Sequence, residues 1–101
     1  MNVLFICNQN QNRSRTAERI FKGMFQTKSA GLFNERPVSE KQLSWADVIL
    51  VMEDHQRSEI ARRFPKQYLK KRILSLDIPD SYKFGQPELV MALTARVEEL
   101  L

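Results

Sequence analysis

Residues 3–14 read Val3-Leu4-Phe5-Ile6-Cys7-Asn8-Gln9-Asn10-Gln11-Asn12-Arg13-Ser14. The four apolar residues are typical of a buried parallel strand, which we expect over residues 2–6. Apolar residues at helical spacing follow, and they predict a helix over residues 14–25 with Ser14 as its cap. A polar loop therefore connects a strand to the N-terminus of a helix, and the only cysteine of the chain is its first residue.

The polar loop is suited to binding an anion. Backbone N–H groups at a helix N-terminus point toward one spot, and the helix dipole favours negative charge there. Three of the five residues between Cys7 and Arg13 are asparagine, which tolerates the left-handed backbone angles that such a loop needs. Arg13 can present its planar guanidinium to two oxygens of a tetrahedral anion.

Cys7 has two interpretations. A lone cysteine after an apolar strand is usually a buried small hydrophobic residue. An anion site beside it favours the thiolate, which is the nucleophilic form, and the Ser14 hydroxyl can donate to the sulfur. The spacing to Arg13 and Ser14 favours catalysis, because Cys-x5-Arg-Ser is the signature loop of cysteine-dependent phosphatases.

Four segments, taken in order, resemble the low-molecular-weight protein tyrosine phosphatase family. They are the Cys7 loop running into Thr16-Ala17-Glu18, then Ser29-Ala30-Gly31, residues 45–52, and Ile78-Pro79-Asp80-Ser81-Tyr82. The resemblance implies hydrolysis of phosphomonoesters, phosphotyrosine among them, through a phosphocysteine on Cys7. It implies that phosphate is bound by Asn8, Gln9, Asn10, Gln11, Asn12, Arg13 and Ser14. Tyr82 would either flank an aromatic leaving group or simply pack over its own loop. Asn10 matches the asparagine that braces the family's loop by side-chain hydrogen bonds.

A cysteine phosphatase also needs a carboxylic acid that protonates the leaving group and later takes a proton from water. Asp80 is our candidate, because Asp80-Ser81-Tyr82 keeps the acid and the aromatic residue of the family two positions apart. Asp77 is the alternative, and it also suits a turn that ends a strand. We therefore expect Cys7, Arg13 and Asp80 to be the catalytic residues.

The sequence departs from the family at four places. Asn12 stands where a second loop cysteine is common, so no loop disulfide can form there. Gln9 stands where glycine is common, and Arg15 where proline is usual. The chain is also short between residues 31 and 43, a region that supplies a wall of the substrate slot in the family and that Phe33 would have to replace.

Strand and helix patterns alternate along the rest of the chain. We expect further strands at residues 27–30, 47–52 and 72–76, and helices at 39–43, 54–63, 66–69 and from 87 onward. This alternation predicts an α/β fold, a doubly wound four-stranded parallel sheet with helices on both faces. Such sheets bind ligands beyond the carboxyl ends of their strands, so the Cys7 loop and residues 77–82 would share one rim.

Length and composition indicate a single domain over residues 1–101. The chain is 43% hydrophobic and 28% charged, without a run of eighteen apolar residues or a visible signal peptide, so we expect no membrane association. The single cysteine excludes an intrachain disulfide and fits the reducing cytoplasm. No cluster of metal-ligand residues is present, and His55 is expected at the surface, so we expect no metal and no cofactor.

The net charge of +4 suits any anionic substrate. Basic residues gather between residues 57 and 72, but aromatic residues for base stacking are not interleaved with them, so we do not expect nucleic acid as a partner. The expected partner is a phosphorylated protein or small molecule.

Three other functions are associated with a similar loop or a similar fold. A non-catalytic module would bind or sense phosphate-like anions with it. Arsenate reduction stays open only with an external thiol, because Cys7 is the single cysteine. A cysteine-phosphorylated sugar-transport component normally lacks both the loop arginine and the acid, so Arg13 and Asp80 argue against it. Turnover of an aryl phosphate would separate hydrolysis from simple binding.

Overall fold

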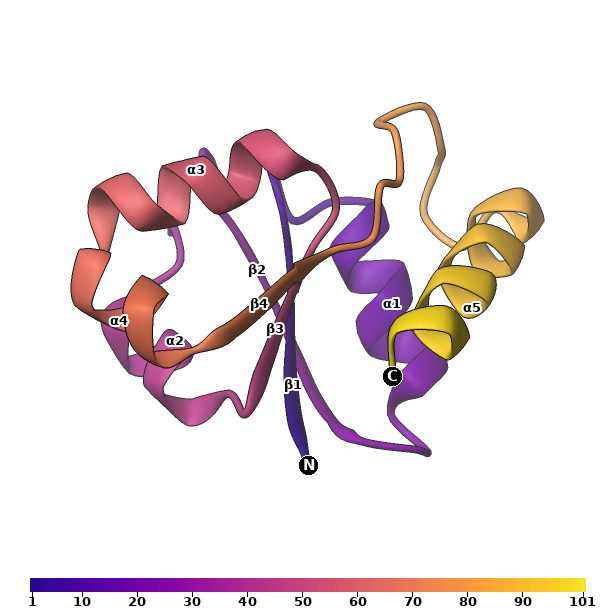
Figure 1. Cartoon of the computed structure of the whole chain (residues 1–101). Helices are drawn as coiled ribbons and strands as arrows, with labels where there is room; N and C mark the ends of the chain where they lie inside the picture. Colours follow the sequence, from indigo (N-terminus) through magenta and orange to yellow (C-terminus); the bar gives the residue numbers. More distant parts are fainter.

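Four parallel strands form the centre of the computed structural model, which describes residues 1–101 (Figure 1). They are β1 (Asn2–Cys7), β2 (Gln26–Gly31), β3 (Val48–Val51) and β4 (Arg72–Ser75), in the spatial order β2-β1-β3-β4. β1 pairs in parallel with β2 on one side and with β3 on the other. The predicted four-stranded parallel sheet is confirmed, and the loop that follows β1 leaves from the middle of its rim.

Helices cover both faces of the sheet, as the alternating pattern predicted. α1 (Arg13–Phe21) and α5 (Pro87–Leu100) lie on one face, at the right of Figure 1. α2 (Glu40–Trp45), α3 (Asp54–Arg63) and α4 (Pro65–Lys70) lie on the other face, at the left. Each strand is joined to the next by a helical crossover, which is the connection that parallel strands require.

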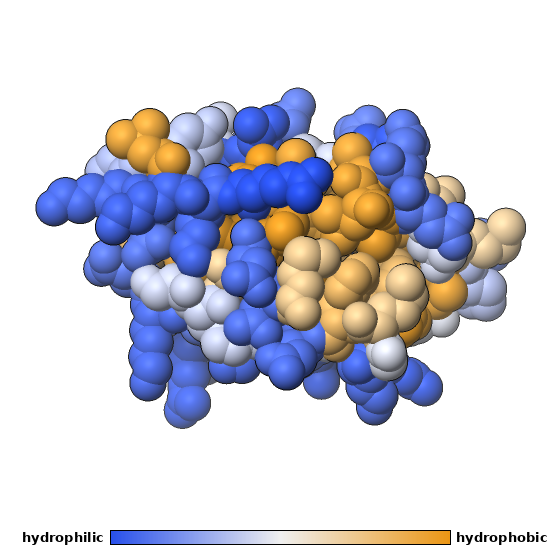
Figure 2. Space-filling model, turned by 60° about the horizontal axis from the view of Figure 1, so that its bottom comes forward, coloured by the Kyte–Doolittle hydropathy of each residue, from blue (hydrophilic) through white to orange (hydrophobic).

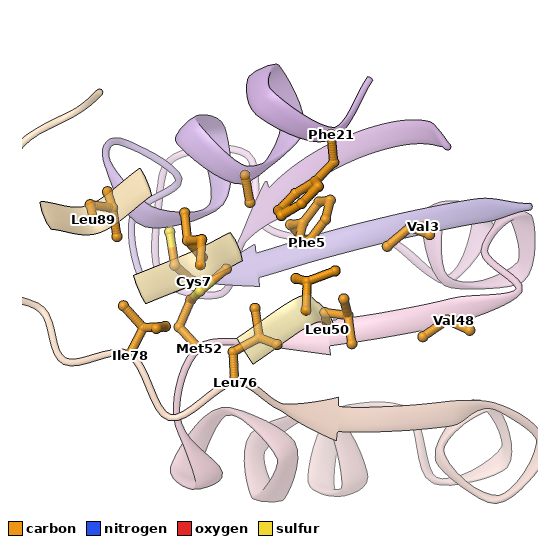
Figure 3. Close-up of a cluster of buried hydrophobic side chains, with 13 residues drawn as sticks. Val3, Phe5, Cys7, Phe21, Val48, Leu50, Met52, Leu76, Ile78 and Leu89 are labelled. Carbon is orange, nitrogen blue, oxygen red and sulfur yellow. The ribbon is translucent and has the colours of Figure 1, made fainter. Parts of the chain in front are cut away.

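Alternate side chains of β1 point into two separate cores. Val3, Phe5 and Cys7 belong to the core under α1 and α5 (Figure 3). Leu4 and Ile6, which lie between them, belong to the core on the other face. The rings of Phe5 and Phe21 stack with their centroids 5.8 Å apart, and truncating either ring to alanine would cost roughly 3–5 kcal/mol. The same alternation brings the Cys7 side chain to the face where α1 begins.

The boundaries of α1 differ from the predicted ones. Asn12 precedes the helix, and Ser14 lies within its first turn with the hydroxyl directed at Cys7. The prediction that Ser14 caps the helix was therefore wrong, because its hydroxyl is engaged by the sulfur. The helix also ends at Phe21 rather than at residue 25, since a turn around Gly23 leads the chain into β2.

Two other helix ends agree with the sequence. The Gln42 N–H donates to Ser39 Oγ at 3.2 Å, and the Gln42 side chain accepts from the Ser39 N–H at 2.9 Å, which is a capping box at the start of α2. Pro65 separates α3 from α4, because a proline cannot continue the preceding helix but suits the first turn of the next one.

Apolar side chains reach the surface at the amino ends of the strands, the end that Figure 2 turns toward the reader. They line a hollow of about 420 Å³, and its apolar residues are Met1, Phe21, Met24, Phe25, Val97 and Leu101. This hollow lies at the opposite end of β1 from Cys7. None of the helices combines the length and the apolarity needed to span a membrane.

Candidate active site

Cys7 lies at the carboxyl end of β1 and is almost fully buried, with an exposed fraction of 3%. Its Sγ lies 2.9 Å from Ser14 Oγ and accepts a hydrogen bond from the Asn10 N–H at 3.1 Å. Ser14 Oγ lies 2.8 Å from Asn10 Oδ1. Cys7 is thus a core residue and also the base of a polar loop, so the two interpretations of the sequence do not exclude each other.

The proton arrangement in this cluster depends on the charge of the sulfur. A neutral Cys7 thiol donates to Ser14, and Ser14 donates to Asn10 Oδ1. A thiolate has no proton, so the Ser14 hydroxyl must donate to it, and Asn10 must then turn its amide to donate to the serine oxygen. In that state the hydroxyl and the Asn10 N–H both stabilise a negative sulfur.

The backbone of the loop shows why asparagine is useful there. Asn10 has a φ of 55°, in the left-handed region, which confirms the expectation that an asparagine takes this angle in the loop. Gln9 has no such angle, although glycine is common at its position in the family. A glutamine therefore fits there without backbone strain, and its exposed side chain stands at the entrance of the loop.

Arg13 is the first residue of α1, and only 1% of it is exposed. Its Nη1 donates to the Glu53 carboxylate, with which it forms an ion pair, and to Ile78 O at 2.7 Å. Both hydrogens of Nη1 are then engaged, which leaves Nε–H and the Nη2 hydrogens. This remaining edge of the guanidinium is one that can bind two oxygens of one anion.

A hollow of about 90 Å³ adjoins this edge. It is lined by Cys7, Gln9, Gln11, Asn12, Arg13 and Asp80. Asp80 Oδ1 lies 3.7 Å from Arg13 Nε, and 60% of the Asp80 side chain is exposed. The sulfur of Cys7, the guanidinium of Arg13 and the exposed carboxylate of Asp80 therefore surround a space suited to one small anion.

Asp77, the alternative acid, does not line the hollow. It is exposed, has a φ of 57° and lies two residues after the end of β4. Aspartate tolerates this left-handed angle, so the residue suits a turn that directs the chain toward Asp80. Between the two candidates, only Asp80 is in reach of the guanidinium edge.

Four residues expected to bind the substrate do not line the hollow. Asn10 and Ser14 lie behind the sulfur, as described above. Asn8 turns its side-chain oxygen toward α3, 3.2 Å from Nε2 of the exposed His55. Tyr82 packs against the core under α1 and α5 rather than over the anion space.

Two residues of the site were not foreseen, Glu53 and Gln56. The Gln56 side chain is fully buried, and its Oε1 accepts hydrogen bonds from the N–H groups of Met52 at 2.7 Å and Glu53 at 3.0 Å. Its Nε2 donates to Asn8 Oδ1 at 3.0 Å and so ties the turn after β3 to the loop after β1. Glu53 lies two residues after the end of β3, so the rule that adjacent parallel strands share a rim places it on the rim of the Cys7 loop, although that rule does not name its partner.

The short segment between β2 and α2 does not supply an aromatic wall. Phe33 is 51% exposed and stacks on Arg63, whose Cζ lies 5.0 Å from the ring centroid, and it does not line the hollow. Arg63 also donates to Leu32 O at 2.6 Å. Hydrogen bonds from Arg62 and Arg63 lower the pKa of Glu59 to about 2. These contacts hold the segment against α3, away from the anion space.

The fold defines the class: the chain has the fold of the low-molecular-weight protein tyrosine phosphatases, as the resemblance of the sequence predicted. The phosphatase of this kind from T. tengcongensis is similar to the chain with a TM-score of 0.76 and 20% identity, over 100% of this chain and 99% of that one. The tyrosine phosphatase Wzb from Escherichia coli K30, in complex with phosphate, is similar with a TM-score of 0.76 and 19% identity, over 98% and 94%.

A third solved structure widens the chemistry that this fold supports. The YwlE arginine phosphatase from Geobacillus stearothermophilus is similar to the chain with a TM-score of 0.68 and 22% identity, over 96% of this chain and 84% of that one. The sequence itself matches no protein-family model and no curated protein. The likeness is therefore one of fold.

Proposed function

We propose that the protein hydrolyses phosphomonoesters through a phosphocysteine on Cys7. The observation that carries this proposal is the hollow in which Sγ of Cys7, the free edge of Arg13 and the Asp80 carboxyl converge. The solved phosphatases with the same fold support it. One unpaired nucleophilic cysteine stays active in a reducing compartment, so we also propose that the protein acts in the cytoplasm.

The reaction follows from the groups that face the hollow. The Cys7 thiolate attacks phosphorus, the bond between phosphorus and the leaving oxygen breaks, and protonated Asp80 gives its proton to that oxygen. Arg13 binds two of the phosphoryl oxygens while their charge is redistributed in the transition state. Water then attacks phosphorus, Asp80 takes the proton of that water, and the sulfur leaves as a thiolate.

The second step depends on the contacts behind the sulfur. A thiolate leaves more readily when hydrogen bonds stabilise its charge, and the Ser14 hydroxyl and the Asn10 N–H lie at 2.9 Å and 3.1 Å from Sγ. We therefore assign Ser14 and Asn10 to the release of the sulfur. The substrate oxygens are assigned to the loop N–H groups and Arg13.

The substrate class is the finer part of the proposal. Gln9, Gln11 and Asn12 line the hollow, and Cys7 is its only hydrophobic residue. A rim of amide side chains can hydrogen-bond a polar leaving group, whereas a phenyl ring would find no aromatic partner there. We include phosphotyrosine, because Wzb is a tyrosine phosphatase, and phosphoarginine, because YwlE is an arginine phosphatase.

The test is steady-state hydrolysis of p-nitrophenyl phosphate by the wild type and by Cys7→Ser, measured side by side. We expect turnover by the wild type, none above background by the variant, and a burst of p-nitrophenol when the second step is slower than the first. Acid quenching during turnover should trap phosphate on the wild-type chain alone.

Other outcomes would identify the alternatives. Tight phosphate binding without turnover would indicate a non-catalytic anion-binding module. Reduction of arsenate in the presence of an external thiol, with no hydrolysis of aryl phosphate, would indicate an arsenate reductase. Rates on a phosphotyrosine peptide and on a phosphoarginine peptide then decide the substrate class.

A further inference from the structure

A basic groove lies beside the candidate active site, between α1 and the loop that precedes α5. It has a volume of about 320 Å³ and is lined by Arg15, Glu18, Arg19, Lys22, Thr27 and Phe84. Neither the catalytic hollow nor the core contains Arg15, Arg19 or Phe84. None of the phosphatase steps above uses them.

Phe84 organises the cations of this groove. Phe84 is 43% exposed. The Cζ atoms of Arg15 and Arg19 each lie 5.7 Å from the centroid of its ring. Two guanidinium groups that share one aromatic ring are held in place before any ligand arrives, which lowers the entropic cost of binding.

The positive charge of the groove is not balanced. Arg15 and Arg19 lie four residues apart on α1, and Lys22 is the C-cap three residues further on, so the three follow one exposed face. The ion pairs of the protein involve Arg13, His55, Arg62, Arg63 and Arg96, and none of the three groove cations. The only acid of the groove, Glu18, accepts a hydrogen bond from Ser29 Oγ on β2 at 2.5 Å.

The groove is connected to the catalytic hollow by hydrogen bonds. The Phe84 N–H donates to Asn12 Oδ1 at 3.0 Å, and the Gly85 N–H donates to Thr16 Oγ1 at 2.9 Å. Asn12 also lines the hollow. The loop that carries Phe84 is therefore bound to a residue of the hollow, so a peptide held by its phosphorylated residue has the basic groove beside it at Asn12.

We propose that the basic groove binds acidic residues that flank the phosphorylated residue of a peptide or protein substrate. This inference rests on the proposed phosphatase function and assigns a substrate class to it. A carboxylate on the substrate would pair with the unoccupied N–H groups of Arg15 and Arg19. A nucleic acid fits less well, because Phe84 is the only aromatic residue of the groove, whereas successive bases need several rings to stack on.

The test compares two phosphotyrosine peptides of equal length, one with glutamate and one with glutamine on both sides of the phosphorylated residue. Exposed ion pairs contribute about 0.2–1 kcal/mol each, so two of them predict a kcat/KM for the glutamate peptide roughly 2- to 30-fold higher. The preference should decrease as salt is added, because exposed charges are screened. Arg15→Gln/Arg19→Gln should abolish the preference and leave the turnover of p-nitrophenyl phosphate unchanged.

The control removes two charges elsewhere. Lys66→Gln/Lys70→Gln acts on exposed residues of α4, on the other face of the sheet, and changes the net charge by the same amount. The control should keep the preference for glutamate. Equal rates on both peptides with the wild type, or equal losses in both double variants, would overturn the proposal.

A binding measurement separates this proposal from the phosphatase function. The unphosphorylated glutamate peptide, labelled with a fluorophore, should bind Cys7→Ser more tightly than the glutamine peptide does, as read by fluorescence anisotropy. Adding Arg15→Gln/Arg19→Gln should remove that difference. If p-nitrophenyl phosphate is not hydrolysed, the phosphatase proposal fails alone; if the anisotropy shows no difference between the peptides, the groove proposal fails alone.

Discussion

Removing the Glu53 side chain should weaken both the fold and the reaction, because Glu53 is the charged partner of a buried arginine. Arg13 is 1% exposed, and its Nη1 is shared between the Glu53 carboxylate and Ile78 O. In Glu53→Ala the guanidinium keeps the carbonyl but loses the carboxylate. A buried cation is then left without its nearest counter-charge, and the side chain is free to rotate away from the hollow.

The loss in free energy of unfolding can be estimated from the burial of the ion pair between Arg13 and Glu53. Breaking a buried ion pair by removing one partner costs roughly 3–5 kcal/mol. The Glu53 side chain is 32% exposed, so water can enter the vacated space, and we expect the lower end, about 3 kcal/mol. At about 4–8 °C per kcal/mol for a domain of this size, the midpoint of thermal unfolding should fall by roughly 12–24 °C.

The activity should fall as well, by roughly 100-fold in kcat/KM, which is the usual effect of a misplacement of about 1 Å at a reacting group. Urea unfolding and hydrolysis of p-nitrophenyl phosphate measure the two effects. Glu53→Gln, which keeps a hydrogen-bond acceptor, should lie between the wild type and Glu53→Ala. Glu98→Gln, on an exposed and unpaired residue of α5, controls for the loss of one negative charge.

An anion in the hollow should compensate for the missing carboxylate. Phosphate or vanadate that binds the folded state alone stabilises the protein by RT ln(1 + [L]/Kd), where [L] is the concentration of the free anion. The stabilisation should be larger in Glu53→Ala than in the wild type, because the ligand then neutralises Arg13. If Glu53→Ala unfolds within about 0.5 kcal/mol of the wild type and keeps its kcat/KM, the ion pair does not position Arg13.

Three more predictions address single groups. Arg13→Lys should reduce kcat/KM by at least about 100-fold on p-nitrophenyl phosphate, because lysine keeps the charge but cannot bind two oxygens with one planar group; near wild-type kinetics would make Arg13 a steering charge. Asp80→Asn should slow aryl phosphates of high phenol pKa by roughly 10²–10⁴-fold while sparing those of low pKa, and Asp77→Asn should not steepen this leaving-group dependence. Glu59→Gln should lower the free energy of unfolding at pH 7, because the folded-state pKa of Glu59 is about 2 and its ordinary value is 4.5. The difference in free energy between the wild type and the variant should be full above pH 4.5 and vanish as the pH falls through 2. A difference that is independent of pH would refute the ion-pair explanation.

The sheet could be predicted because its strands carry a strong local signal. Residues 3–6 and 48–51 are continuous apolar runs, and parallel strands buried on both faces require such runs. The helix after the Cys7 loop was placed correctly but ended too late, because the apolar pattern continues through Met24 and Phe25 into the turn. Helix ends depend on backbone conformation, and periodicity does not encode it.

The site was only partly predictable, because two of its residues act through tertiary contacts. The spacing of Cys7, Arg13 and Ser14 is local and could be read directly. Glu53 and Gln56 lie forty or more residues away, and nothing in their own sequence context indicates which arginine or loop they will meet. Tyr82 shows that a local motif can also mislead. Its position in the motif suggests that it lies in the substrate slot, whereas its side chain packs against the core.

The two carboxylates near Arg13 lie in different surroundings, and on that ground we propose different tasks for them. Glu53 is bound on Nη1, the side of the guanidinium that faces the protein, and it contributes to holding the side chain. Asp80 lies at the Nε edge, is 60% exposed and is 3.7 Å away, so it is not committed to the arginine. A phosphate that binds this edge takes the place of Asp80 as the counter-charge and puts negative oxygens beside it. In the mechanism that we propose, the proton of the leaving group comes from this carboxyl. Exchanging the two roles would leave a fixed acid out of reach of the leaving oxygen, which is why we assign proton transfer to the exposed carboxylate and positioning to the one that is held.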